Sequence, residues 1–305
     1  MPKRNKILIT GSSGMLGLDL CQELGQDYAV EGADMAAPAC RDAKFYLGDI
    51  TDRNNITGIV AEARPDLVIH AAALTNVDGC ESDKAGAYRI NAEGAGNVAL
   101  ACKETGAALV YISTDFVFDG KKGRPYKETD RTAPLSVYGD SKLKGEELVR
   151  KVLKNYFILR TSWLYGANGK NFVDTIVAKA STEKVLRVVD DQVGSPTYTK
   201  DLARAIHKLL DIITSHEPRA TSHGIYHVSN SGKVSWYDYA KEILKIAGLK
   251  TKVVPISSEE LNRPAKRPAM SMLDNSKFSR FTGYRMRGWK AALKDYLKSK
   301  EKYAE

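Results

Sequence analysis

Residues 6–17 read Lys-Ile-Leu-Ile-Thr-Gly-Ser-Ser-Gly-Met-Leu-Gly, and this stretch decides the fold. Its first half is an apolar run suited to a buried parallel strand, and leucines then recur at helical spacing over residues 16–24. Gly11 allows a tight turn, Gly14 lets the backbone approach a pyrophosphate, and Gly17 lets the helix pack closely on the strand. A glycine-rich turn between a strand and a helix is typical of dinucleotide-binding domains, whereas three incidental loop glycines are the alternative.

Strands and helices continue to alternate as far as about residue 166. Further strands are expected at 28–34, 45–50, 66–70, 107–112 and 156–160. This alternation predicts an α/β fold with a Rossmann-type doubly wound parallel sheet, in which ligands bind beyond the carboxyl ends of the strands. We therefore expect residues 1–166 to form a dinucleotide-binding domain that includes the catalytic helix. Residues 167–305 are expected to be mostly a smaller substrate-binding C-terminal lobe, with some segments returning to the main domain.

Small and polar residues at the expected strand ends are candidates for holding the cofactor. Asp34 can accept hydrogen bonds from an adenosine ribose and would repel a 2′-phosphate, which favours NAD. Arg41 lies close enough in sequence to compensate for that phosphate, so NADH and NADPH both stay open. The complete cofactor-binding set is Gly11, Ser13, Gly14, Met15, Leu16, Gly17, Asp34, Asp49, Ile50, Ala71, Ala72, Ala73, Asn91, Ser113, Tyr138 and Lys142.

Tyr138 and Lys142 are candidates for the catalytic groups. They are four residues apart at the start of a predicted helix and therefore share one of its faces. An ammonium group beside a phenol favours the phenolate and lowers the phenol's pKa from about 10 towards the range of a general acid. Ser113 and Thr114 follow a strand and are candidates for positioning a substrate oxygen, with a turn or helix-capping role as the alternative.

Composition limits the classes of protein to which the chain can belong. The 46 Lys and Arg and 37 Asp and Glu residues are spread along the 305 residues, and the net charge of +9 indicates a solvated surface rather than a nucleic-acid-binding patch. The four cysteines lack the spacing of a zinc site, and Asp190 and Asp191 lack histidine partners, so no metal is expected. Because no apolar run suits a signal peptide or a membrane span, we expect a cytoplasmic protein.

Six further motifs accompany the glycine turn and the Tyr138–Lys142 pair: AAALTNVD at 71–78, STDFVFDG at 113–120, PLSVYG at 134–139, RTSWLY at 160–165, DQVGSPT at 191–197 and RPAMSML at 267–273. In this order, the motifs resemble those of the dTDP-4-dehydrorhamnose reductase family of extended short-chain dehydrogenases/reductases. The resemblance implies NAD(P)H-dependent reduction of the C4 ketone of dTDP-4-dehydro-β-L-rhamnose to give dTDP-L-rhamnose.

The resemblance also implies roles for individual residues. The catalytic set would be Thr114, Tyr138 and Lys142. The substrate would be contacted by Thr75, Val77, Phe116, Trp163, Asn171 and Arg267. Phe116 stands where many members of the family have tyrosine, which removes one hydroxyl from the sugar site. Some members bind Mg²⁺ at a dimer interface, but no full ligand set is evident in this sequence; a homodimer stays open.

Two alternative functions stay open. Another nucleotide-sugar enzyme of the same fold, such as an epimerase or a dehydratase, would recycle a tightly held NAD instead of consuming NAD(P)H. A regulatory subunit similar to the β subunit of methionine adenosyltransferase would act through its partner enzyme. The intact Tyr138 and Lys142 argue against a purely binding role.

Overall fold

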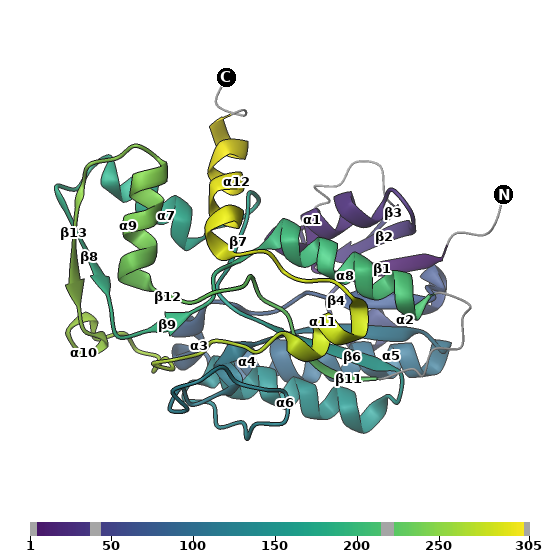
Figure 1. The fold of residues 1–305 in the computed structure, drawn as a ribbon. Helices are drawn as coiled ribbons and strands as arrows, with labels where there is room; N and C mark the ends of the chain where they lie inside the picture. Colours follow the sequence, from purple (N-terminus) through teal and green to yellow (C-terminus); the bar gives the residue numbers. More distant parts are fainter. Residues whose placement is uncertain (1–4, 37–43, 215–222, 302–305) are drawn as a thin grey trace.

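A seven-stranded parallel sheet with helices on both faces is the centre of the protein (Figure 1), as seen in a computed structural model that describes residues 5–36, 44–214 and 223–301. The strand order is β11-β6-β5-β4-β1-β2-β3, so the winding direction reverses between β1 and β4. The prediction of a doubly wound sheet is confirmed. The strands are β1 (Lys6–Thr10), β2 (Ala29–Asp34), β3 (Lys44–Leu47), β4 (Leu67–His70), β5 (Ala108–Thr114), β6 (Tyr156–Thr161) and β11 (Gly224–His227).

The first strand shows why both faces of the sheet must be covered. Successive strand residues point to opposite faces, and Ile7 and Ile9 lie in one core while Leu8 lies in the other. The first core is completed by α1 (Met15–Leu24), α8 (Thr199–Ile213) and α11 (Ser276–Thr282). The second is completed by α2 (Arg53–Ala63), α5 (Ala95–Thr105) and α6 (Val137–Val152). Residues beyond 166 therefore add the strand β11 to the main sheet, and α8 and α11 to the helices that cover one of its faces.

The segment 84–105 is not the single regular helix that its pattern predicts. It is divided into α4 (Lys84–Tyr88), a π-helical turn η1 (Arg89–Gly94) and α5. Asn91 in this turn accepts a hydrogen bond from the Leu74 amide at 2.8 Å, and its own amide group donates to the Leu74 carbonyl and to Ser141 Oγ, both at 3.1 Å. The π turn thus points the Asn91 side chain towards the loop after β4. The spacing of apolar residues in the sequence does not predict this direction.

A second body of structure, the C-terminal lobe, has an aromatic-rich core of its own, which includes Tyr165, Tyr198, Tyr239, Trp289 and Tyr296. Its helices are α7 (Phe172–Ala180), α9 (Trp236–Ile246), α10 (Ser258–Leu261) and α12 (Trp289–Glu301). Three two-stranded pairings support them: β7 (Leu164–Tyr165) with β10 (Thr197–Tyr198), β9 (Val193–Gly194) with β12 (Val234–Ser235), and β8 (Val185–Val189) with β13 (Lys252–Ile256). Among the residues described, no helix is both long and apolar enough to cross a bilayer.

Candidate active site

A cavity of about 800 Å³ lies beyond the carboxyl ends of the main-sheet strands. Its lining joins the glycine turn and the starts of α1 and α6 to residues of the C-terminal lobe. All three predicted catalytic residues line it, as do all the predicted cofactor-binding residues except Asn91. Of the predicted substrate-binding residues, the cavity lining contains Thr75, Val77, Phe116, Trp163 and Arg267. Residues distant in sequence therefore meet at the sheet edge where ligands bind in such folds.

One side of the cavity, the glycine wall, consists of Gly11, Gly14, Gly17 and Ala71–Ala73. Gly11 has a φ of +74°, and a Cβ atom there would lie 2.5 Å from the Ala72 amide nitrogen. A Cβ atom on Gly17 would overlap the Gly11 carbonyl oxygen and lie 2.7 Å from Ser12 Cα. The three segments therefore pack backbone against backbone. The wall places the N-terminus of α1, where amide groups and the helix dipole attract a phosphate, next to the cavity.

Asp34 ends β2 beside this wall. Its carboxylate accepts hydrogen bonds from the amides of Ser13 at 2.9 Å and Ala36 at 3.2 Å, so it also holds the turn in place. Asp34 lines the cavity, as expected of a residue that faces an adenosine ribose. Arg41, the residue expected to compensate for a 2′-phosphate, lies outside the described residues.

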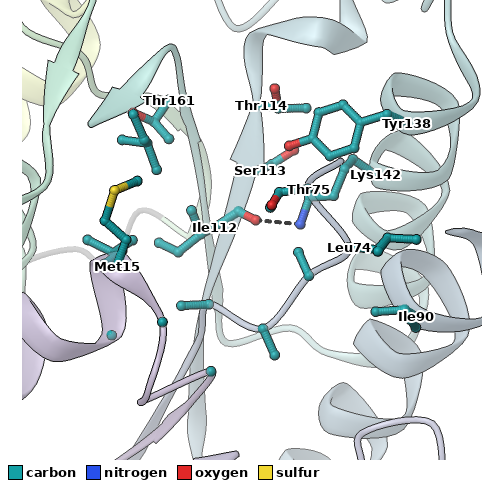
Figure 2. Close-up of a pocket in the computed structure, with 18 of the residues that line it drawn as sticks. Met15, Leu74, Thr75, Ile90, Ile112, Ser113, Thr114, Tyr138, Lys142 and Thr161 are labelled. Atoms are coloured by element: carbon teal, nitrogen blue, oxygen red, sulfur yellow. Dashed lines mark hydrogen bonds between the residues drawn. The ribbon is translucent and has the colours of Figure 1, made fainter. Parts of the chain in front are cut away.

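The three predicted catalytic side chains come from two neighbouring elements. Ser136 caps α6 by accepting a hydrogen bond from the Gly139 amide at 3.2 Å, and this start places Tyr138 and Lys142 on the cavity side of the helix. Figure 2 shows Tyr138 reaching from α6 towards Thr114 at the end of β5, and Lys142 reaching towards Ile112 in the same strand. The ammonium group of Lys142 donates a hydrogen bond to the Ile112 carbonyl at 2.7 Å (Figure 2).

The electrostatics of this group differ from the expectation for Tyr138. Burial raises the pKa of its phenol, the Asp115 carboxylate adds to the rise, and a hydrogen bond with Thr114 only partly opposes it. The ammonium of Lys142 lies 4.2 Å from the ring centre of Tyr111. The expected net lowering of the Tyr138 pKa is therefore wrong for this structure, because burial raises it. The i, i+4 spacing sets the shared face but says nothing about how deeply each group is buried.

Asp115 is a cavity residue that the sequence reasoning missed. It is buried directly after Thr114, whose hydroxyl donates to Asp115 Oδ1 at 3.1 Å. Burial raises the pKa of this carboxyl to about 7, and hydrogen bonds from Ser271 and Thr114 oppose the rise. Its place beside Thr114 at a predicted strand end was the signal that could have identified it.

The cavity lining also includes an aromatic wall, formed by Trp163 and Trp236. Their rings stack with centroids 3.5 Å apart and planes 5° from parallel, and Phe172 packs on Trp236 at 4.4 Å. Trp163 has a φ of +48°, a left-handed conformation in which its carbonyl accepts a hydrogen bond from the Thr197 amide at 3.1 Å. The family resemblance predicts Trp163 but Trp236 was not predicted, because no local sequence pattern connects residues so far apart in the chain.

A short segment of the lobe, the strap of residues 263–268, is fastened to the main domain by Asp78 on α3 (Val77–Ser82). Arg267 forms two hydrogen bonds with the Asp78 carboxylate, at 3.0 and 2.9 Å. Arg263 and the Ala265 amide donate to the same carboxylate at 3.1 and 3.2 Å. Burial acts to raise the pKa of Asp78, but these hydrogen bonds outweigh it and hold the pKa below its ordinary value. The strap therefore brings Arg267 to the cavity.

Asn171 and Asn91 lie outside the cavity lining. Asn171 caps α7 by accepting from the Asp174 amide at 3.0 Å, and its amide group donates to the Gly166 carbonyl and Tyr296. Its side chain is thus occupied inside the lobe core, while that of Asn91 is occupied by Leu74 and Ser141. Contact of either residue with a ligand stays a prediction. Within the described part of the chain, no three His, Cys, Asp or Glu side chains form a group able to hold a metal.

Comparison with known proteins agrees with this architecture. The model of the family described as the RmlD substrate binding domain matches residues 5–302. The chain belongs to this family. The resemblance to dTDP-4-dehydrorhamnose reductases seen in the sequence is thereby confirmed.

Several relatives are similar over almost their whole length. The chain is 43% identical to the spore coat polysaccharide biosynthesis protein SpsK of Bacillus subtilis (strain 168), covering 97% of this chain and 98% of that protein. It is 41% identical to the dTDP-4-dehydrorhamnose reductase of Streptomyces griseus, covering 95% and 92% of the two chains. The structure of the dTDP-4-dehydrorhamnose reductase of Bacillus anthracis str. Ames in complex with NADP superimposes with a TM-score of 0.88 at 40% identity, covering 97% and 99%.

Proposed function

We propose that the protein is an NAD(P)H-dependent oxidoreductase that reduces the C4 ketone of dTDP-4-dehydro-β-L-rhamnose to give dTDP-L-rhamnose. The observation that carries this proposal is a single cavity lined by the glycine wall, by Thr114, Tyr138 and Lys142, and by residues of the C-terminal lobe. Relatives named for this reaction, and one solved with NADP, support it. We place its action in the cytoplasm; a homodimer is a further proposal, open to size-exclusion chromatography.

The glycine wall fits a dinucleotide, because side chains at Gly11 and Gly17 would push apart the backbone segments that form it. The N-terminus of α1 would receive the pyrophosphate and Asp34 the adenosine ribose. When bound, NADH or NADPH supplies the hydride for the ketone carbon. We propose that residues 1–166 form the dinucleotide-binding domain with the catalytic helix, and that residues 167–305 are mostly a lobe that helps to bind the sugar nucleotide.

Tyr138 acts as the general acid in this mechanism. Its raised pKa keeps the phenol protonated at neutral pH, so it holds a proton to donate to the oxygen that develops negative charge at C4. The Thr114 hydroxyl would turn from Asp115 to donate its one hydrogen bond to the same oxygen, and Lys142 would stabilise the phenolate that Tyr138 becomes. The substrate would lie between Thr75, Val77, Phe116, Trp163 and Arg267, with the Arg267 guanidinium favouring the negative diphosphate.

The test is oxidation of added NADH or NADPH with dTDP-4-dehydrorhamnose generated in situ. Turnover of one cofactor per sugar supports the reductase, whereas sugar conversion without cofactor consumption would point to an epimerase or dehydratase. Tyr138→Phe should lower kcat by about 10²–10⁴-fold, since it removes the acid and preserves the ring. Tyr88→Phe is the matched control, because that hydroxyl bonds Asp140 away from the cavity lining. Near-native turnover in Tyr138→Phe would exclude the assigned acid.

A further inference from the structure

A buried ion pair lies one helical turn beyond Lys142, outside the cavity lining. Glu146 on α6 and Arg160 on β6 are 1% and 2% exposed. Arg160 donates from Nε to Glu146 Oε1 at 2.9 Å and from Nη2 to Oε2 at 2.6 Å. Ser113 Oγ also donates to Oε1, at 2.6 Å. Three hydrogen bonds from two neighbouring strands therefore fix both the position and the negative charge of this carboxylate.

Such a pair is not accounted for by stability alone. Removing two charges from water costs several kcal/mol per ion, and replacing a buried pair by apolar groups of similar volume is often neutral or stabilising. The guanidinium of Arg160 also lies 5.1 Å from the ring centre of Phe118, so it is enclosed by protein on that side as well. Glu146 lies four residues after Lys142 and therefore on the same face of α6. Its carboxylate is thus placed to interact with the Lys142 ammonium group.

Lys142 is itself almost fully buried, with 2% of its surface exposed. Among the described residues, the groups around it are His70 on β4, Tyr111 and Ser113 on β5, Asp115 after β5, Tyr138 and Glu146 on α6, and Arg160 on β6 through Glu146. Burial lowers the pKa of His70 to about 3, so it is neutral, and burial raises the pKa of Asp115 to about 7, so it is only partly charged. Glu146 is the one carboxyl group in this described set that is paired with a guanidinium group, that of Arg160.

We propose that Glu146 is a positioning residue for the reduction: fixed by Arg160 and Ser113, its carboxylate is the counter-ion that keeps the Lys142 ammonium charged next to Tyr138. Only a charged ammonium group stabilises the phenolate that is left when Tyr138 gives up its proton. The inference deepens the proposed function and rests on it for its catalytic meaning. The ionisation of Lys142 itself is independent of any substrate.

The charges around Lys142 predict a direction for the effect. Burial lowers the pKa of Lys142 to about 7, and the Glu146 carboxylate works against this fall. Neutralising Glu146 should therefore lower the pKa further, and the ammonium should lose its proton below neutral pH. The exposed Glu147 offers a matched comparison, since it is the next residue on the helix and pairs with Lys144 at the surface.

The first experiment is an NMR titration of protein labelled with [13Cε]lysine, with Lys142→Met identifying the resonance. In Glu146→Gln, the Lys142 titration midpoint should fall by about one pH unit or more, a tenfold loss of proton affinity. In Glu147→Gln it should stay at the native value. An unchanged midpoint in Glu146→Gln would overturn the proposal. Because no sugar is present, this result stands even if the proposed reductase activity fails.

A second arm separates this role from a structural one. If Glu146→Gln does not fold, the double variant Glu146→Gln/Arg160→Met replaces the pair by neutral groups and should show the same downward shift of the midpoint. In the enzyme assay, the alkaline limb of the kcat profile should move down with the midpoint, and Glu146→Asp should restore it. A native midpoint in the double variant, or a kcat that falls equally at every pH, would contradict the role of Glu146.

Discussion

The glycine wall and the aromatic wall face the same cavity but are held in place by different means. In the glycine wall, Gly11 and Gly17 bring three backbone segments together without side chains between them. In the aromatic wall, Trp163 lies between β6 and β7, Trp236 begins α9, and their rings stack on each other. Backbone packing leaves little room for adjustment, whereas stacked rings keep their shape when one contact weakens. We therefore expect the two walls to differ in their tolerance of substitution.

The largest effect is expected for Gly17→Ala in the glycine wall. A Cβ atom there overlaps the Gly11 carbonyl, so the turn must shift, and NAD(P)H binding should weaken by on the order of 100-fold, or about 2.7 kcal/mol. Fluorescence titration of NADPH measures this. Gly58→Ala on the exposed face of α2 is the control, because an added Cβ meets nothing within 4 Å. Equal binding by both variants would remove the distinction between the walls.

Asp78→Asn should produce the next largest effect. We expect it to weaken binding of the sugar nucleotide and to leave binding of NADPH unchanged. The amide keeps the shape but weakens four hydrogen bonds that fasten the strap, including both from Arg267. The KM for the sugar nucleotide should rise by roughly 10–100-fold, while the Kd for NADPH stays native. Glu260→Gln, which breaks only the exposed pair with Arg187, serves as the comparison. A parallel rise in the NADPH Kd would show that the strap serves both walls.

Acid should destabilise the protein through two buried histidines: His70 at the end of β4, next to the glycine wall, and His227 on the edge strand β11. Burial lowers the pKa of each to about 3, against 6.5 in the unfolded chain. Below pH 6.5 the unfolded state takes up the proton and the folded state does not. Stability is thus lost as pH falls from 6.5 towards 3, by roughly 2 kcal/mol per histidine at pH 5.

The measurement for this prediction is urea unfolding of the native protein and of His227→Asn at pH 6.5 and pH 5. Asp115 acts with the opposite sign, because its raised pKa lets the folded protein take up a proton first. Because Asp115 is present in both proteins, its contribution disappears from the difference between their stability losses. The native protein should lose roughly 2 kcal/mol more than His227→Asn on acidification. Equal losses would mean that His227 is protonated in the folded state.

The smallest effect is expected for Trp236→Leu in the aromatic wall. Leucine keeps an apolar surface against Phe172 and Trp163 but loses the stack, which is worth about 0.5–1.5 kcal/mol. The KM for the sugar nucleotide should rise by about 2–12-fold, with kcat within a factor of two of native. Steady-state kinetics measure both constants. Trp289→Leu is the control, because Trp289 lies in the core of the same lobe but outside the cavity lining, so it shows the effect of general destabilisation.

The two walls also differ in how far they could be predicted from the sequence. Glycine spacing and strand–helix alternation are local, so the sheet, the turn and the face shared by Tyr138 and Lys142 follow from patterns within a few residues. The stack of Trp163 on Trp236 and the hydrogen bonds between Asp78 and the strap join segments far apart in the chain. No periodic pattern within a short stretch of sequence predicts such contacts. The pKa of Tyr138 was missed for a related reason, because burial depends on everything that packs around the phenol.

The position of β11 in the main sheet has a consequence for how the protein is made. This strand pairs with β6 at the sheet edge, yet 62 residues of chain separate Thr161 from Gly224. A nascent chain leaving the ribosome therefore carries β6 as an open edge until β11 emerges behind it, and open edges invite pairing with other chains. Expression of residues 1–166 alone should give an aggregation-prone product, and the growing polypeptide is a natural client for a chaperone during that interval.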